Sequence, residues 1–175
     1  PLKANRPRTS TNYITIHNTG MAHPTATASG LNDYIHSTDR VASWHFSVDD
    51  TEAYQELKLD EIGWHAGDGS TTYGDYWLSA GVWCIGGGNR NGIGIETCVN
   101  QGSNYNATIK HLSKLIVTTI FPQFENLNLT RVKQHYHFSG KDCPMVIRHC
   151  IGWNRVMNFM AIENFGFEQM KDVEF

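Results

Sequence analysis

The chain has 175 residues, of which 14 are Lys or Arg and 17 are Asp or Glu, so its formal net charge is −3. Only 18% of the residues are charged, against roughly 25% in an average domain, and 11% are aromatic, so we predict one folded domain with a substantial core. The sequence contains neither a basic cluster nor an apolar run of about 20 residues, which excludes nucleic acid and membrane as expected partners.

Residues 1–10 predict an irregular lead-in that has neither the apolar core of a signal peptide nor an initiator methionine. We therefore expect a piece of a longer protein that is made in the cytoplasm of a host cell. The cysteines have no regular spacing, which argues against a disulfide scaffold and favours synthesis in a reducing compartment. They are Cys84, Cys98, Cys143 and Cys150.

The first predicted elements are a strand and a short helix. Residues 12–17 alternate and are rich in β-formers, which predicts a strand that ends on His17. Ser29 is expected to cap a helix over residues 30–37. The side chains predicted on the inner face of this helix are Leu31, Tyr34 and Ile35.

A hairpin and a long loop are predicted next. Residues 42–49 alternate again and predict a second strand, which returns over residues 53–59. Residues 62–67 place an aromatic and a histidine between glycines, a composition that suits the rim of a site. Residues 68–82 predict an insertion rich in glycine and tyrosine, and loops of this length are usually functional or disordered.

The second half of the chain predicts two strands and two helices. Residues 91–99 predict a buried strand that is interrupted by one carboxylate. Residues 107–121 have apolar side chains at helical spacing and stop before a proline, while residues 129–134 predict a short strand. Residues 151–165 predict an amphipathic helix. Its inward side chains are expected to be Trp153, Val156, Met157, Met160 and Ile162.

The interleaved strands and helices predict an α/β fold, with a single domain built on a central mixed β-sheet flanked by helices. We expect residues 11–165 to form the catalytic domain. Residues 1–10 would precede it, and residues 166–175 would form a tail or the start of a linker.

Residues 133–144 contain two histidines, two lysines and a cysteine before a proline. Imidazole and thiolate are good zinc ligands, but two ligands from one loop leave a tetrahedral site incomplete. His17 can supply the third ligand, so we predict one zinc ion bound by two histidines and Cys143, with an open position for water. Spacing does not decide between His135 and His137. We choose His135, which lies eight residues before Cys143 and gives a loop able to fold back on the ion.

Two charged residues are predicted to take part in catalysis. Glu96 follows the apolar stretch 93–95, and burying an unpaired carboxylate is costly, so we expect a base near the attacking water or an anchor for a ligand histidine. Lys141 lies two residues from Cys143, where a cation would stabilise an oxyanion. The alternatives are a partly exposed strand carboxylate and a solvated loop lysine.

Four residues are predicted at the rim of the site as substrate-binding groups, namely Trp44, His45, Trp64 and His65. The two histidines could instead stand behind the metal ligands or pack in the interior. The aromatic rings, including Tyr73, Tyr76 and Trp77, could instead belong to the core.

Five blocks resemble, in the family's order, the N-acetylmuramoyl-L-alanine amidases of the phage-lysozyme and peptidoglycan-recognition type (the amidase type 2 family). The blocks are residues 13–20, 43–49, 63–67 and 91–96, and the closing pattern of a histidine, seven residues and Cys-Pro in 135–144. The resemblance implies this family's fold and implies His17, His135 and Cys143 as zinc ligands, with Glu96 and Lys141 as catalytic residues. Some members have a tyrosine on the second strand; this chain has Trp44 and His45 there, so a tyrosine-dependent proton transfer is not expected.

The resemblance implies a zinc-dependent enzyme that hydrolyses the amide between N-acetylmuramic acid and L-alanine in bacterial peptidoglycan. We expect a monomeric phage endolysin that acts at the cell wall after release, with a wall-binding domain after residue 175. One alternative is a peptidoglycan-recognition module that binds without cutting, and another is a cysteine hydrolase that uses Cys143 as its nucleophile. Family binders typically lack the cysteine ligand, so the presence of Cys143 favours the enzyme.

Overall fold

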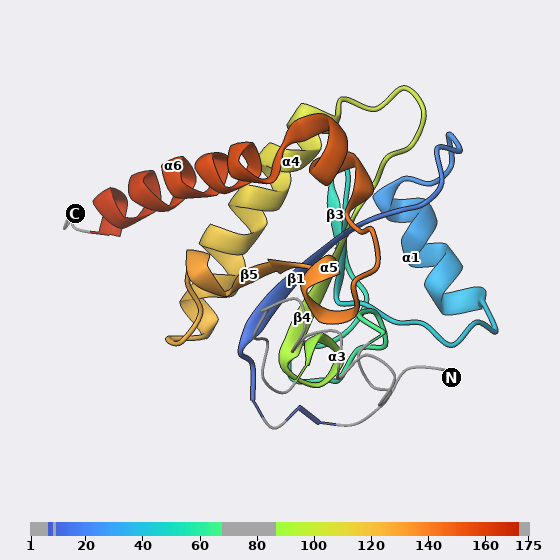
Figure 1. Ribbon diagram of the computed structural model, residues 1–175, viewed down its shortest axis with the longest axis horizontal. Helices are drawn as coiled ribbons and strands as arrows, with labels where there is room; N and C mark the ends of the chain where they lie inside the picture. The colour runs from blue at the N-terminus through green and yellow to red at the C-terminus, as the bar shows by residue number, and fades with distance from the viewer. Residues whose placement is uncertain (1–6, 9, 68–86, 172–175) are drawn as a thin grey trace.

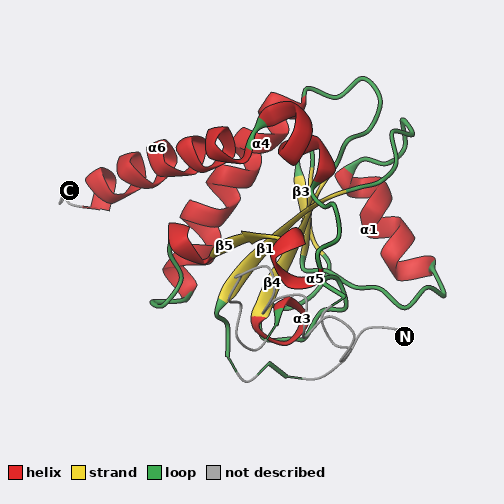
Figure 2. Cartoon of the chain, in the orientation of Figure 1, coloured by secondary structure: helices red, strands yellow, loops and turns green. Residues whose placement is uncertain are grey.

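The computed structural model describes residues 7, 8, 10–67 and 87–171 (Figure 1). Its centre is a five-stranded sheet with the order β3-β2-β4-β1-β5. The strands are β1 (Tyr13–Asn18), β2 (Phe46–Val48), β3 (Ala53–Gln55), β4 (Gly92–Thr97) and β5 (Val132–Gln134). The α-helices described are α1 (Ala28–Ser37), α3 (Gly88–Asn91), α4 (Tyr105–Lys114), α5 (Tyr136–Ser139) and α6 (Trp153–Lys171). Figure 2 shows the strands at the centre with helices around them, so the predicted α/β architecture is confirmed.

The sheet is mixed, as predicted, because only its edge strand β3 runs antiparallel to its neighbour. β1 pairs in parallel with β4 and β5, and β2 pairs in parallel with β4. The carboxyl ends of these four parallel strands therefore lie at one edge of the sheet, where α/β proteins usually form their sites. The register places His17 beside Glu96 at that edge, and β5 ends one residue before His135.

The main hydrophobic core lies between one face of the sheet and the helices α4 and α6. Isoleucines alternate along β1 and β4, so Ile14, Ile16, Ile93 and Ile95 point to this face and are fully buried. Burying each such side chain stabilises the fold by about 1.5–3 kcal/mol. The helical residues packed against them include Ile109, Leu112, Ile116, Val156 and Met160.

The opposite face of β1 and β4 is lined by smaller and more polar side chains. A small cluster of Tyr13, Ala66 and Phe138 packs there, so the loop before residue 67 and the turn of α5 both lie against the sheet. Further along, α1 packs on the hairpin strands, and its Leu31 and Ile35 contact Trp44. The polar side chains of β1 and β4 therefore lie on the face of the sheet that is opposite the main hydrophobic core.

The first helix differs from its prediction at its start and on its inner face. α1 begins at Ala28, and its cap is Thr27, whose hydroxyl accepts a hydrogen bond from the Gly30 N–H at 3.1 Å; Ser29 is not the cap. Tyr34 is 36% exposed, because the buried stripe of Leu31 and Ile35 leaves it at the margin.

The terminal helix also differs from its prediction. It begins after Gly152, whose φ of 89° is unfavourable for residues with a side chain, and it continues to Lys171 instead of ending at 165. Ile162 is 71% exposed and not inward, because the second half of α6 extends away from the sheet (Figure 1).

Several strands are shorter than predicted, because a strand extends only as far as its backbone pairs with a neighbour. Several helices include π-helical or 3-10 segments. The predicted strands 42–49 and 53–59 pair only as β2 and β3, and the strand 129–134 pairs only as β5 after the 3-10 turn η4 (Leu129–Arg131). The helix predicted over 107–121 consists of α4, the π-helical segment η2 (Leu115–Ile120) and the 3-10 turn η3 (Phe121–Gln123). A second π-helical segment, η5 (Ile147–Ile151), precedes α6. The strand predicted over 91–99 is confirmed as β4. The predicted insertion, with Tyr73, Tyr76 and Trp77, lies outside the described residues, and within those residues no helix is both long and apolar enough to span a membrane.

Candidate metal centre

His17 is held at the carboxyl end of β1 with its side chain on the face opposite the main core. The residue is 1% exposed, and its neighbour in the parallel register is Glu96 of β4. Residues in register on adjacent strands point to the same face, so the imidazole and the carboxylate lie together. The His17 Nδ1 atom is 4.0 Å from Glu96 Oε1.

His135 and Cys143 come from one loop that folds back on itself after β5. The single turn α5 follows His135 and ends on Gly140, which has the left-handed φ of 71° that glycine adopts without strain. The loop is closed by the Tyr136 N–H, which donates to the Cys143 carbonyl at 2.8 Å. It is tied to β1 by the Val146 N–H, which donates to Asn18 Oδ1 at 3.0 Å.

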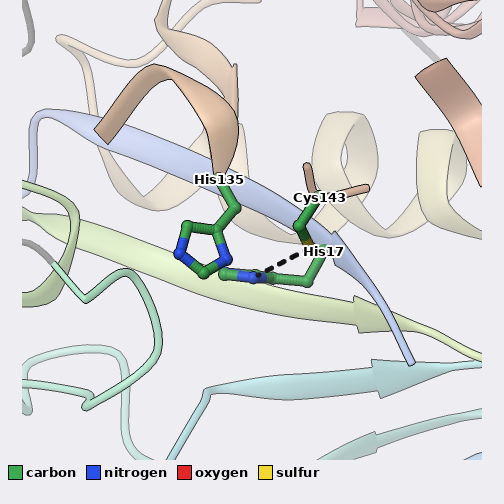
Figure 3. Close-up of side chains that lie close together, drawn as sticks. All are labelled: His17, His135 and Cys143. Atoms are coloured by element: carbon green, nitrogen blue, oxygen red, sulfur yellow. Dashed lines mark hydrogen bonds between the residues drawn. The ribbon is translucent and has the colours of Figure 1, made fainter. Parts of the chain in front are cut away.

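These two segments bring His17, His135 and Cys143 together in the interior (Figure 3). Each residue offers one ligand atom, and these atoms all lie within 4.8 Å of one another. The Cys143 Sγ atom is 3.8 Å from His17 Nδ1. In a tetrahedral zinc site such donors are separated by about 3.3–3.7 Å, so a small contraction would fit the three atoms to one ion.

Both nitrogens of His135 are buried without a hydrogen-bond partner in the described part of the chain. The Ala66 backbone lies near enough to raise the pKa of the ring slightly but makes no hydrogen bond of good geometry with it. A buried polar atom without a partner costs roughly 1–3 kcal/mol. A metal ion bound to one of the ring nitrogens would supply such a partner. The donor set and the orphaned ring therefore both fit a bound cation.

His137, the alternative left open by spacing, lies elsewhere. Its Nδ1 accepts a hydrogen bond from the Gln134 N–H at 3.2 Å, and it is not part of the described group of possible ligands. In an extended strand, the side chains of His135 and His137 would point to the same face. The helical turn that follows His135 makes them point in different directions. The geometry therefore brings His135, as predicted, to His17 and Cys143.

The electrostatics of the group favour neutral imidazoles. Burial, followed by the neighbouring His135, His65 and Lys141, lowers the pKa of His17 well below 6.5. Burial and then Lys141 lower the pKa of His135 to about 4. Both rings are therefore neutral near pH 7 and have a lone pair available for a metal.

Glu96 and Lys141 are two charged residues beside the candidate ligands His17, His135 and Cys143. The Glu96 side chain is 18% exposed, and its buried Oε2 has no hydrogen-bond partner among the described residues. Burial raises the pKa of Glu96 to about 7, although the nearby Lys141 cation opposes the rise. Lys141 is exposed beside the group, and its charge lowers the pKa values of His17 and His135.

The four predicted rim residues occupy different environments. Trp44 is buried in the cluster with α1, and its indole N–H donates to Ser47 Oγ at 2.8 Å, so it has no free surface for a substrate. His45 is fully buried between backbone groups. Trp64 is 42% exposed, so it is the tryptophan of this set with a surface that a substrate can reach. His65 is partly buried, and its Nδ1 lies 3.0 Å from His17 Nε2.

Asn89 supports the site and was not anticipated from the sequence. Its side-chain oxygen accepts hydrogen bonds from the N–H groups of His65 and Ala66, at 2.8 and 2.7 Å. Asn89 lies in α3, more than twenty residues beyond the loop that it holds. An asparagine that follows a run of glycines has no periodic signal, so this contact could not be read from the sequence.

The stability of the metal-free protein is expected to fall as the pH decreases from about 6.5, and His45 is a main cause. Its Nδ1 accepts from the Gly94 N–H and its Nε2–H donates to the Glu61 carbonyl, at 3.0 Å each, so the fold requires the neutral ring. Burial and the Arg8 charge lower the pKa of His45 to about 3. Between about pH 6.5 and that value, the unfolded chain therefore binds a proton that the folded chain does not, which costs about 1.4 kcal/mol per pH unit.

Urea unfolding of the metal-free protein at several values between about pH 7 and pH 4 measures this slope. His45→Gln is expected to lower stability at neutral pH and to reduce the slope by up to one proton. The matched variant His36→Gln, at an exposed histidine of α1, controls for the loss of any histidine. An identical slope in wild type and His45→Gln would contradict the prediction.

The family model described as N-acetylmuramoyl-L-alanine amidase matches residues 7–146. The N-acetylmuramoyl-L-alanine amidase XlyA of Bacillus subtilis is 40% identical over 132 residues, which cover 75% of this chain and 39% of XlyA. The amidase CwlH of the same organism is 36% identical over 147 residues, or 83% of this chain and 51% of CwlH. The chain thus spans between about two fifths and one half of these curated relatives.

A solved structure agrees with the fold described above. The catalytic domain of XlyA superposes on this chain with a TM-score of 0.70 and a sequence identity of 34%. The superposition covers 88% of this chain and 91% of that domain. The likeness therefore extends over most of this chain and most of that domain.

Proposed function

Because the chain belongs to the N-acetylmuramoyl-L-alanine amidase family, we propose that it hydrolyses the amide between N-acetylmuramic acid and L-alanine in bacterial peptidoglycan, in the manner of an endolysin. The observation that carries the proposal is the convergence of His17, His135 and Cys143 in a chain of this family. The proposed site of action is the bacterial cell wall. A monomeric state and an attached wall-binding domain stay predictions.

We propose that His17, His135 and Cys143 hold one zinc ion. Two imidazoles and one thiolate suit a borderline-soft ion, and three protein ligands leave the fourth position open, as catalytic zinc sites require. When bound, zinc supplies a Lewis acid that polarises a carbonyl and lowers the pKa of a water ligand toward about 7. Binding would also give a partner to one of the two orphaned nitrogens of His135.

Two charged residues of the chain would supply the proton transfer and the charge stabilisation. Glu96 in its ionised form accepts the proton from the water that attacks the scissile carbonyl, and it then delivers a proton to the leaving amine of L-alanine. The Lys141 cation stabilises the negative charge that develops on the carbonyl oxygen. The C–N bond breaks, which leaves a carboxylate on the lactyl group and a free amino terminus on the peptide.

Trp64 is proposed to contact the substrate. It is exposed and adjoins His65, whose side chain reaches the candidate ligand His17. An aromatic face of this kind packs on a sugar ring or on an apolar part of a stem peptide.

The cysteine-hydrolase alternative is disfavoured by the state of its nucleophile. Burial, and then the Glu96 charge, raise the pKa of Cys143 to about 12. A catalytic thiol needs a lowered pKa, because the thiolate is the nucleophile. In this buried environment the Cys143 thiolate needs a neighbouring cation to stabilise it. A bound metal ion would be such a cation.

Digestion of purified bacterial cell wall followed by mass spectrometry tests the reaction. The expected products are peptides with free L-alanine amino termini and glycan strands without peptides. New reducing sugar ends or cleaved peptide cross-links would contradict an amidase, and binding to the wall without any release would support the recognition module.

Removal of the metal is expected to abolish the activity. Dialysis against EDTA should reduce wall lysis to background, and one equivalent of zinc should restore it, because the fourth ligand position and the Lewis acid are lost together. Magnesium serves as the control, since it prefers oxygen ligands and should not restore lysis. Full activity in the metal-free protein would contradict the zinc proposal and revive the thiol mechanism.

A further inference from the structure

His65 stands directly behind one of the candidate ligands. Its Nδ1 lies 3.0 Å from His17 Nε2, and the two rings are nearly perpendicular, at 89° with centroids 5.0 Å apart. The other ring nitrogen of His17, Nδ1, faces Cys143 Sγ at 3.8 Å. The two nitrogens of His17 therefore have different partners, one in the ligand group and one behind it.

The direction of the hydrogen bond follows from this division. A ring nitrogen that binds a metal must offer its lone pair, so when His17 Nδ1 does so, the proton of the neutral ring is on Nε2. That N–H then donates to His65 Nδ1, which accepts with its own lone pair. Metal-binding histidines usually donate to a carboxylate, a backbone carbonyl or water, and here the acceptor is a second imidazole.

The His65 ring packs closely against two glycines. A Cβ atom added to Gly94 of β4 would lie 2.6 Å from His65 Cδ2, and one added to Gly63 would lie 2.8 Å from the same atom. Real Cβ atoms do not approach so closely, so the ring occupies space that only glycine leaves open at these positions. Asn89 holds the His65 N–H from a third segment of the chain.

We propose that His65 is a positioning residue that accepts the His17 Nε2–H and thereby holds His17 Nδ1 toward the metal. This inference rests on the proposed zinc centre. It assigns His65 a role that is exerted through His17 and not through contact with the substrate. Of the three roles that the sequence allowed for His65, the contact with His17 favours the one behind the ligands.

Three substitutions separate an acceptor role from simple packing. His65→Asn keeps an acceptor oxygen near the position of Nδ1. His65→Gln has the same polarity but carries its oxygen near the position of Nε2. His65→Ala removes the acceptor altogether, and His36→Ala, an exposed histidine on α1, controls for the loss of any histidine.

The primary measurement is the zinc dissociation constant by competition with a chromophoric chelator. His65→Ala and His65→Gln are expected to weaken zinc binding by about 10- to 100-fold, while His65→Asn and His36→Ala stay within a few-fold of wild type. Cobalt substitution supplies a second readout that does not depend on activity. The visible absorption of the cobalt protein should change in the Ala and Gln variants and persist in the Asn variant.

The outcomes distinguish this inference from the proposed function. If wild type binds no zinc, the zinc centre itself is wrong. If wild type binds zinc and all three variants match it in affinity and cobalt spectrum, His65 does not position His17. Equal weakening in the Asn, Gln and Ala variants would also overturn the acceptor role, because packing alone would then explain the loss. If His65→Ala does not fold, the comparison of Asn with Gln decides.

Discussion

Cys143→Ser is expected to abolish zinc binding and amide hydrolysis together. A serine hydroxyl stays protonated near neutral pH and is a poor zinc ligand, so His17 and His135 would remain as an incomplete pair. The Lewis acid contributes several kcal/mol to stabilisation of the transition state, and each 1.4 kcal/mol changes the rate about tenfold. We therefore expect the rate to fall by about a thousandfold or more.

The metal content of the purified protein and its rate of wall lysis measure this effect. Elemental analysis should change from about one zinc per chain to near none. The matched control is Cys150→Ser, because Cys150 is a free cysteine that is exposed and lies outside the candidate metal group. The control should keep both zinc and activity. A Cys143→Ser protein that retains stoichiometric zinc would rule out Cys143 as a ligand.

Glu96→Gln is expected to reduce kcat by about a hundred- to ten-thousandfold while zinc stays bound. The amide has nearly the shape of the carboxylate but cannot accept the proton of the attacking water. Zinc retention is expected because Glu96 is not among the three candidate ligands. Stability should not fall, since the buried carboxylate has an oxygen without a described hydrogen-bond partner.

Steady-state kinetics on soluble muramyl peptides, with zinc analysis of the same samples, measure this prediction. The control is Glu52→Gln, an exposed carboxylate in the turn between β2 and β3. It should leave kcat unchanged. Loss of zinc in Glu96→Gln would instead indicate a structural role, and an unchanged kcat would exclude Glu96 as the base.

The pH dependence of the reaction provides an independent check on Glu96. The residue has a raised pKa of about 7 in the metal-free protein, and a bound cation would lower that value. Only the ionised carboxylate accepts a proton, so kcat/KM should fall as the pH decreases through a pKa at or below about 7. Glu96→Gln should remove this acid limb from the residual activity.

The sequence was sufficient to nominate most of the residues of the candidate site. His17 was identified because it ends an alternating strand, and Glu96 because it interrupts an apolar one, and both signals depend only on local periodicity. Cys143 followed from the short loop that combines histidine, lysine and a Cys-Pro pair. The mixed sheet followed from the interleaving of predicted strands and helices, and the strands β1 and β4 with their buried isoleucines followed from their apolar patterns.

Helix ends and exposed faces were less predictable. Thr27 and Ser29 are both good caps, and the choice between them depends on where Leu31 and Ile35 must point to reach Trp44. Ile162 fits an amphipathic pattern, but the sheet does not extend beneath that part of α6. Local propensity cannot decide such cases, because the outcome depends on packing partners from elsewhere in the chain.

By itself, the sequence determined which residue types were available at the strand ends and in the closing loop. Only the tertiary structure placed His135, and not His137, beside His17 and Cys143. It also buried the side chains of Trp44 and His45 and placed His65 against His17 between Gly63 and Gly94. The physical reason is that periodicity reports the environment of a residue along its own strand or helix. Contacts between residues tens of positions apart are set by the order in which strands pair and by how the connecting segments cross the sheet, which the pattern within one strand or helix does not specify.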